Sequence, residues 1–219
     1  MKPVLREQRG GREFLLTKNL ARGRRVYNEG LVLREGEEYR TWDPFRSKLA
    51  GAILKGLPDD VIRPGDKVLY LGTSTGTTVS HVSDIVGDTG VVIGVEFAPR
   101  VAREFVENVA RHRKNVIPFV ADARDPAKYT MVQVDVVYCD IAQPDQTELA
   151  IKNSRLMLRK GGKLLLVVKS RSIDVLEPPE RIFKREASKL EEAMFKVIDA
   201  INLEPFEEDH ALIYAIKEY

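Results

Sequence analysis

The sequence contains little cysteine and no long apolar segment. Its single cysteine, Cys139, excludes a disulfide framework and a cysteine-based zinc site, and it favours a reducing compartment. No apolar stretch approaches the roughly 20 residues that a membrane-spanning helix needs. The arginine-rich start of the chain also lacks the apolar core of a secretory signal. We therefore expect a cytoplasmic protein with no membrane association and no metal site.

An excess of charge of one sign is also missing, because the formal net charge is only +2. The charges are nevertheless unevenly spread. Residues 1–25 carry eight lysines and arginines against two glutamates, and residues 152–171 carry seven against no acid. Clustered basic side chains are typical of nucleic-acid-binding surfaces. Solvent-exposed faces without any partner explain the same pattern equally well, so charge alone leaves both interpretations open.

The most informative segment is the loop at residues 72–78, which follows the apolar run at residues 68–71. We expect a strand, a glycine turn and a helix start there, a junction that binds nucleotide-like ligands in open α/β sheets. This segment does not match the dinucleotide-binding motif G-x-G-x-x-G, because Ser74 and Thr77 replace its second and third glycines. It does not match the phosphate-binding loop motif G-x-x-x-x-G-K either, because no lysine follows Gly76. A nucleoside without phosphates remains, and S-adenosylmethionine is the obvious candidate.

Apolar runs alternate with helical patterns from residue 68 onward. We expect parallel strands at 68–71, 91–97, 116–120, 134–138 and 164–169, helices at 99–113, 146–158 and 179–195, a helix break at Gly161-Gly162, and a closing antiparallel hairpin at 196–203 and 211–216. Strands that alternate with helices form a parallel sheet covered on both faces. The expected fold class is therefore α/β, with the Rossmann-like seven-stranded sheet typical of S-adenosylmethionine-dependent methyltransferases.

A small antiparallel β domain is expected at residues 1–42, ahead of a methyltransferase domain at residues 43–219. Asp43-Pro44 is an N-cap followed by proline, which predicts the start of a helix. Trp42 is expected to pack the two domains together. Within the first domain, glycine-containing turns separate short predicted strands at 13–17, 30–33 and 39–42.

Polar or aromatic residues follow four of the expected strands, at the edge of the sheet where a ligand sits. After the second strand, Glu96 is placed to accept hydrogen bonds from both ribose hydroxyls of a nucleoside, and Phe97 to stack on its adenine. After the third strand, Asp122 is placed to accept a hydrogen bond from the adenine amino group. Each residue alone is explained as well by a helix cap or a core position. Their recurrence at successive strand ends favours a binding site.

Four ionisable residues form a candidate catalytic set. Asp140 follows one apolar run, Lys169 ends another, His210 begins a third, and Lys48 lies on a helix upstream of the first strand. A base must remove the proton of a hydroxyl that attacks a sulfonium methyl, and a lysine does so only when its pKa falls from about 10.4. We hypothesise that Lys169 is this base, with Lys48 as a second cation, Asp140 to fix the geometry and His210 as a supporting hydrogen-bonding partner. A lysine that simply reaches solvent from a strand end is the structural alternative.

The chain resembles the fibrillarin family over essentially its whole length. Eukaryotic members begin with a Gly/Arg-rich tail, which is absent here, so the resemblance is to the archaeal form. Thr73-Ser74-Thr75 departs from the smaller residues that family members often carry, which puts the packing of this loop in doubt. The resemblance rests on long segments in the same order, at residues 41–50, 69–84, 94–97, 122–124, 140–146 and 169–174.

The resemblance implies a 2′-O-ribose methyltransferase of ribosomal RNA or transfer RNA, with S-adenosylmethionine as methyl donor. It places the family's Lys-Asp-Lys-His set on the four candidate residues above. It also implies a box C/D guide ribonucleoprotein, in which a guide RNA, a Nop-domain scaffold protein and a kink-turn-binding ribosomal-type protein accompany the enzyme. The implied cofactor contacts are Gly72, Thr77, Thr78, Glu96, Phe97, Asp122, Ala123, Asp140, Ile141, Ala142 and Gln143.

Two other functions stay open at this stage. A stand-alone RNA methyltransferase would bind RNA tightly without partners, which the nearly neutral net charge does not favour. A structural subunit of an RNA particle would keep the fold without activity, although the four candidate catalytic positions argue against it. A DNA methyltransferase acting on base nitrogens is disfavoured, because Gln143-Pro144 lacks the second proline and the aromatic residue of the expected motif.

Overall fold

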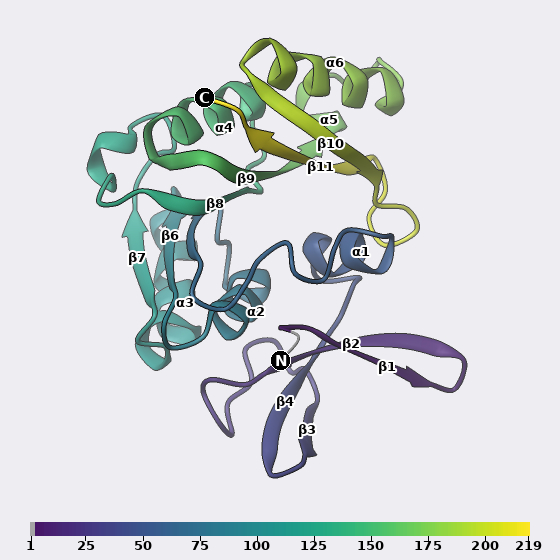
Figure 1. Cartoon of the computed structure of the whole chain (residues 1–219), viewed down its shortest axis with the longest axis vertical. Coiled ribbons are helices and arrows are strands. Elements are labelled where there is room, and N and C mark those ends of the chain that lie inside the picture. Colours follow the sequence, from purple (N-terminus) through teal and green to yellow (C-terminus); the bar gives the residue numbers. More distant parts are fainter. Residues whose placement is uncertain (1–2) are drawn as a thin grey trace.

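The computed structural model describes residues 3–219 and contains two separate sheets (Figure 1). The larger sheet has seven strands in the order β10-β11-β9-β8-β5-β6-β7. The five strands from β7 to β9 are parallel, and β11 runs antiparallel to both of its neighbours. This confirms the predicted seven-stranded fold with its closing hairpin. The strands are β5 Lys67–Leu71, β6 Val91–Glu96, β7 Val116–Val120, β8 Val134–Cys139, β9 Leu158–Lys169, β10 Phe195–Asn202 and β11 His210–Lys217.

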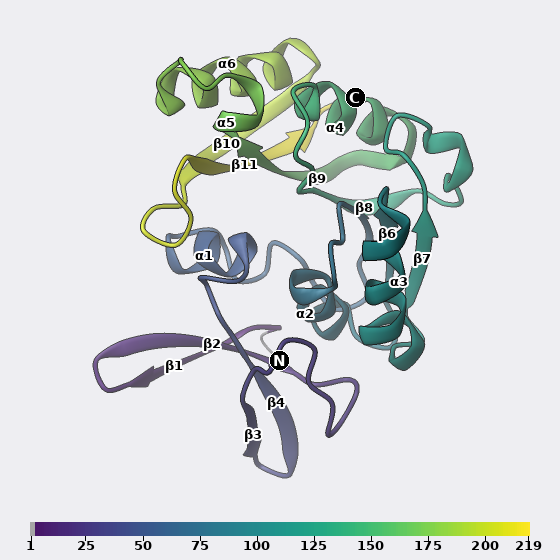
Figure 2. The same ribbon diagram turned by 180° about the vertical axis from the view of Figure 1, so that it is seen from behind.

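Helices cover both faces of this sheet, as the two views show (Figures 1 and 2). Alternate residues of each strand point to opposite faces. Tyr70, Tyr138 and Leu165 therefore pack with the first three helices, whereas their neighbours, such as Leu69 and Val137, pack with the fourth and sixth. The helices are α1 Lys48–Leu54, α2 Thr77–Val86, α3 Pro99–Asn108, α4 Gln146–Met157, α5 Ser170–Ile173 and α6 Pro179–Glu192, with short 3-10 turns at Ala110–His112 and Pro126–Lys128.

The smaller sheet is antiparallel throughout, in the order β1-β2-β4-β3. The sequence pattern did not predict its first strand, because β1 is mostly charged and shows no apolar alternation. Its pairing instead depends on the tight turn at Gly10 and Gly11, whose φ angles of 56° and 76° suit a two-residue hairpin. The strands are β1 Leu5–Arg9, β2 Arg12–Lys18, β3 Leu31–Arg34 and β4 Glu37–Trp42.

Helix α1 begins later than predicted. Asp43 does not cap it, because its carboxylate accepts from the backbone N–H of Phe45 at 2.9 Å within a separate turn. Ser47 is the N-cap instead, with Oγ accepting from the N–H of Ala50 at 3.4 Å. Lys48, one of the four candidate catalytic residues, is consequently the first residue of this helix.

Strand β9 begins earlier than predicted, at Leu158, and Gly161-Gly162 lie inside it rather than breaking a helix. The register between β8 and β9 shifts over this segment, so both glycines lie in an irregular part of the strand, and each has a local reason to lack a side chain. Gly161 has a φ of +71°, and a Cβ on Gly162 would stand 2.5 Å from Leu158 Cδ1. Glycine thus marks close packing inside a strand here, which the sequence pattern cannot distinguish from a helix stop.

A buried polar network joins the small sheet to α2. Arg40 from β4 forms ion pairs with Glu29 at 2.7 Å and with Asp84 of α2 at 2.8 Å, and Arg113 contacts the other oxygen of Asp84. All four side chains are at most 1% exposed. Beside them, Trp42 stacks on the His81 ring with centroids 4.8 Å apart, as its predicted packing role requires.

His81 serves this same interface. Its Nδ1 lies 2.7 Å from Thr17 Oγ1 and its Nε2 lies 2.7 Å from the Tyr27 hydroxyl, both in the first 42 residues. Burial and the neighbouring charges of Arg40 and Arg113 lower the pKa of His81 well below its usual range. The neutral ring therefore fits a packing role.

Over residues 3–219, no helix has both the length and the apolar character that crossing a membrane requires.

Candidate active site

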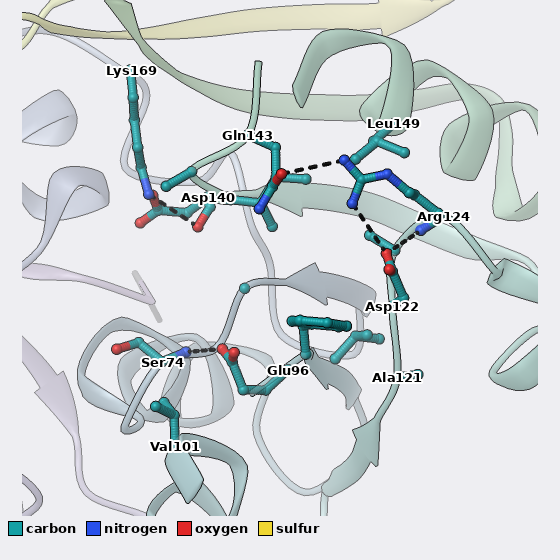
Figure 3. A pocket seen from close by; sticks show the side chains of 16 residues that line it. Ser74, Glu96, Val101, Ala121, Asp122, Arg124, Asp140, Gln143, Leu149 and Lys169 are labelled. Atoms are coloured by element: carbon teal, nitrogen blue, oxygen red, sulfur yellow. Dashed lines mark hydrogen bonds and ion pairs between the residues drawn. The ribbon is translucent and has the colours of Figure 1, made fainter. Parts of the chain in front are cut away.

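A cavity of about 350 Å³ opens at the carboxyl edge of the parallel strands (Figure 3). Nine of the predicted cofactor residues line it: Gly72, Glu96, Phe97, Asp122, Ala123, Asp140, Ile141, Ala142 and Gln143. Thr77 and Thr78 lie at the start of α2, where the Thr77 carbonyl accepts from Ser80 Oγ and Thr78 Oγ1 donates to Ser47 Oγ at 3.0 Å. The sequence reasoning missed further lining residues: Ser74, Val95, Val101, Ala121, Arg124 and Leu149.

The glycine loop is pressed against the end of β8. Gly72 has a φ of +83°, and a Cβ there would stand 2.4 Å from the carbonyl oxygen of Asp140. Gly76 has a φ of +114°, and a Cβ there would stand 2.3 Å from Val109 Cγ2. Both positions therefore need glycine for a left-handed backbone and for close approach. Gly72 and Ser74 of this loop line the cavity.

Glu96 is held rigidly at the end of β6. One carboxylate oxygen accepts from the N–H of Ser74 at 2.9 Å (Figure 3), and the other accepts from the N–H of Ala98 at 3.1 Å. A carboxylate oxygen can accept more than one hydrogen bond. Glu96 therefore retains the capacity to accept from two adjacent hydroxyls. The next residue, Phe97, is 67% exposed and presents a free aromatic face beside the same cavity.

Asp122 and Arg124 form the opposite wall. Asp122 accepts from the N–H of Arg124 at 2.8 Å, and the Arg124 guanidinium reaches Gln143 at 3.2 Å (Figure 3). The same guanidinium also donates to Asp145 at 2.8 Å. The arginine thus connects the loop after β7 to the loop after β8. No local sequence signal predicts this connection, because the partners are about 20 residues apart and meet only in the folded sheet.

Asp140 lies between two lysines beside the cavity. Its carboxylate is 2.8 Å from Lys169 Nζ at the end of β9 and 3.5 Å from Lys48 Nζ at the start of α1. Burial alone would raise the pKa of Asp140, but the charges of Lys169 and Lys48 outweigh it and hold that pKa below its usual value. The three side chains are 14–20% exposed, so a substrate can still reach them. The structure therefore brings together three of the four predicted catalytic residues.

His210 lies beside this lysine–aspartate cluster. It is the first residue of β11 and is paired in register with Lys169 across the two strands. Its Nδ1 donates a hydrogen bond to the carbonyl oxygen of Glu208 at 2.6 Å. His210 also contributes to the lowered pKa of Asp140 through its charge.

Comparison with known proteins identifies the family. The sequence profile named Fibrillarin matches residues 3–219. This chain belongs to the fibrillarin family. A relative from Saccharolobus islandicus, the fibrillarin-like rRNA/tRNA 2′-O-methyltransferase, is 55% identical over 201 residues, which cover 91% of this chain and 86% of the relative.

Two solved fibrillarin structures place the site in context. The fibrillarin of Aeropyrum pernix, solved in complex with natively bound S-adenosyl-L-methionine, has a TM-score of 0.89 and 46% identity, covering 98% of this chain and 94% of that one. A fibrillarin in complex with Nop5p has a TM-score of 0.85 and 37% identity, covering 99% of this chain and 98% of that one. The whole fold of this fibrillarin family member is therefore shared with relatives that bind this cofactor and this protein partner.

Proposed function

We propose that this chain is the S-adenosylmethionine-dependent enzyme that methylates the 2′-hydroxyl of ribose in ribosomal RNA and transfer RNA. The observation that carries the proposal is the lysine–aspartate cluster at the mouth of the strand-end cavity. The two lysine Nζ atoms lie within 3.5 Å of the Asp140 carboxylate, and together these groups can hold a hydroxyl while one lysine, as the neutral amine, takes its proton. The family and its 55% identical methyltransferase relative support this activity.

The cavity fits S-adenosylmethionine by chemistry as well as by size. Its volume of about 350 Å³ lies within the usual range for small-ligand sites. Glu96 would hold the ribose hydroxyls, Phe97 would cover the adenine and Asp122 would accept from the adenine amino group. The glycine loop at residues 72–78 itself carries no lysine or arginine, which suits a ligand without phosphates. When bound, the cofactor supplies an electrophilic methyl group.

The geometry of the cluster supports one proposed catalytic role for each residue. Lys169 lines the cavity and is oriented by Asp140 at 2.8 Å, and its Nζ would take the proton of the 2′-hydroxyl as the neutral amine. Asp140 stays ionised and orients both lysines. Lys48 supplies a second positive charge that favours the oxygen anion developing on the ribose. His210, paired in register with Lys169, is a supporting hydrogen-bonding partner.

We further propose that the protein works in the cytoplasm, as the catalytic subunit of a box C/D guide ribonucleoprotein. The Nop5p complex of a related fibrillarin supports a Nop-domain scaffold as partner. Guide RNA and a kink-turn-binding protein would then select the nucleotide, because this chain shows no sequence-reading module such as an RRM or KH domain. The 2′-hydroxyl as methyl acceptor restricts the substrate to RNA.

Transfer of radiolabelled methyl from S-adenosylmethionine to a guide-complementary RNA tests this proposal. We expect activity only when the protein is combined with its scaffold, the kink-turn protein and the guide RNA. A target with 2′-deoxyribose at the modified position should accept no label. Activity of the protein alone would favour a stand-alone methyltransferase, and no activity in any combination would favour a structural subunit.

Loss of the Glu96 carboxylate is expected to weaken cofactor binding specifically. In Glu96→Ala, the ribose hydroxyls lose their acceptor, so the Kd for S-adenosylmethionine should rise at least about tenfold, the cost of one or more hydrogen bonds to a charged group. Titration calorimetry measures this Kd directly. The exposed Glu104 on α3 offers a matched control, and Glu104→Ala should bind like the wild type. Unchanged affinity in Glu96→Ala would remove Glu96 from the site.

A further inference from the structure

Gln146, the first residue of α4, holds the backbone of Lys169. Its side chain is fully buried and uses both ends of the amide. Oε1 accepts from the N–H of Lys169 at 3.0 Å, and Nε2 donates to the carbonyl of Lys169 at 3.4 Å. Nε2 also donates to the carbonyl of Gln143 at 3.0 Å. One side chain therefore bonds to the lysine-bearing strand end and to a loop that lines the cavity.

The need for this amide comes from the sheet itself. The pairing of β8 with β9 ends at Cys139 and Leu166, and the N–H of Asp140 bonds to the carbonyl of Leu71 on β5, which lies on the other side of β8. Strand β9 continues to Lys169 beyond the reach of β8. Gln146 replaces the neighbouring strand at that point, because a side-chain amide offers the same donor and acceptor as a peptide group.

We infer that Gln146 is a positioning residue for methyl transfer, one that fixes Lys169 relative to the cofactor-binding loop. The inference rests on the proposed function, in which Lys169 takes the proton of the ribose hydroxyl. Lys169 Nζ can stay 2.8 Å from Asp140 only if its own backbone is fixed. The same amide also bonds to Gln143 in the loop that lines the cavity. The buried side chain of Gln146 therefore sets the distance between Lys169 and this loop.

The isosteric variant Gln146→Glu tests this inference. A carboxylate keeps the acceptor for the Lys169 N–H but replaces the donor, so oxygen faces the two carbonyls that Nε2 now bonds. The end of β9 must shift, and a displacement of about 1 Å costs a catalytic group on the order of 100-fold in rate. We expect kcat for methyl transfer in the assembled particle to fall about 10- to 100-fold, with a much smaller change in the Kd for S-adenosylmethionine.

Asn115 provides a matched control for the burial of a new carboxylate. It is a buried amide far from the cavity with the same pattern of bonds. Its Nδ2 donates to the carbonyls of Ser83 at 2.9 Å and Gly87 at 3.0 Å, and its Oδ1 accepts from Ser83 Oγ at 2.7 Å. Asn115→Asp should lower the midpoint of thermal unfolding about as much as Gln146→Glu, yet keep kcat within about twofold of the wild type.

The outcomes separate this inference from the proposed function. A Gln146→Glu variant with wild-type kcat, in an assay where Lys169→Ala is inactive, would overturn the positioning role alone. Activity in Lys169→Ala would overturn the proposed base itself. Equal losses of kcat in Gln146→Glu and Asn115→Asp would show that the loss reflects general destabilisation, and they would overturn the positioning role. If Gln146→Glu does not fold, the uncharged and shorter Gln146→Asn replaces it, and the same loss of kcat is expected.

Discussion

Replacing Lys169 with arginine is expected to reduce the rate of methyl transfer at least about 100-fold, the usual contribution of a positioned base. Arginine keeps the positive charge beside Asp140, but its guanidinium does not give up a proton under physiological conditions. The variant therefore separates a base from a cation that only stabilises charge. Methyl transfer at saturating S-adenosylmethionine in the assembled particle measures the rate, and calorimetry shows whether the cofactor still binds.

A second lysine on the same strand serves as control. Lys160 is exposed on β9, and its ammonium lies over the Tyr219 ring rather than near the cavity. Lys160→Arg should therefore leave the rate of methyl transfer unchanged. A Lys169→Arg variant with a near-normal rate would show that position 169 needs only a positive charge, and the proton would then have to leave by another route.

Replacing Asp84 with alanine is expected to destabilise the protein by about 3–5 kcal/mol, the typical cost of breaking a buried ion pair from one side. Asp84 contacts both Arg40 and Arg113, and all three side chains are essentially inaccessible to water. Its loss leaves two buried guanidinium groups without their shared partner. Denaturant unfolding followed by circular dichroism gives the free energy of unfolding.

An exposed acid on the same segment completes the Asp84 experiment. Asp88 follows α2 and faces solvent, so Asp88→Ala should change the free energy of unfolding by no more than about 0.5 kcal/mol. A loss below about 1 kcal/mol in Asp84→Ala would mean that water or a shifted side chain satisfies the arginines. The small sheet would then depend on its apolar contacts, such as the stack of Trp42 on His81.

The main sheet was predictable because its strands are buried on both faces and read as apolar runs. Strand β1 was not, since its charged residues acquire their register only from the turn that joins it to β2. The start of α1 was misplaced for a related reason. Asp43-Pro44 is a valid cap by sequence, but the tertiary fold gives that function to Ser47, which also binds Thr78.

The candidate site was partly predictable for the same structural reason. Residues that follow parallel strands converge on one edge, so Glu96, Asp122 and Asp140 could be grouped without coordinates. Hydrogen bonds between side chains and segments that are distant in the sequence could not be predicted in this way. Arg124 reaching across to Asp145, and Gln146 taking the place of a missing strand, have no signature in the sequence. The domain division at residue 42 and the individual catalytic roles remain predictions.

The buried cysteine at the end of β8 has a practical consequence for work on the assembled particle. Cys139 is inaccessible, and burial together with the neighbouring Asp140 carboxylate raises the pKa of its thiol to about 12. Only the thiolate reacts readily with maleimides and spin-label reagents. The wild-type chain should therefore behave as a cysteine-free protein toward such probes. A single surface cysteine could then carry a fluorophore or spin label, and distances to the guide RNA could be followed without altering the native residue.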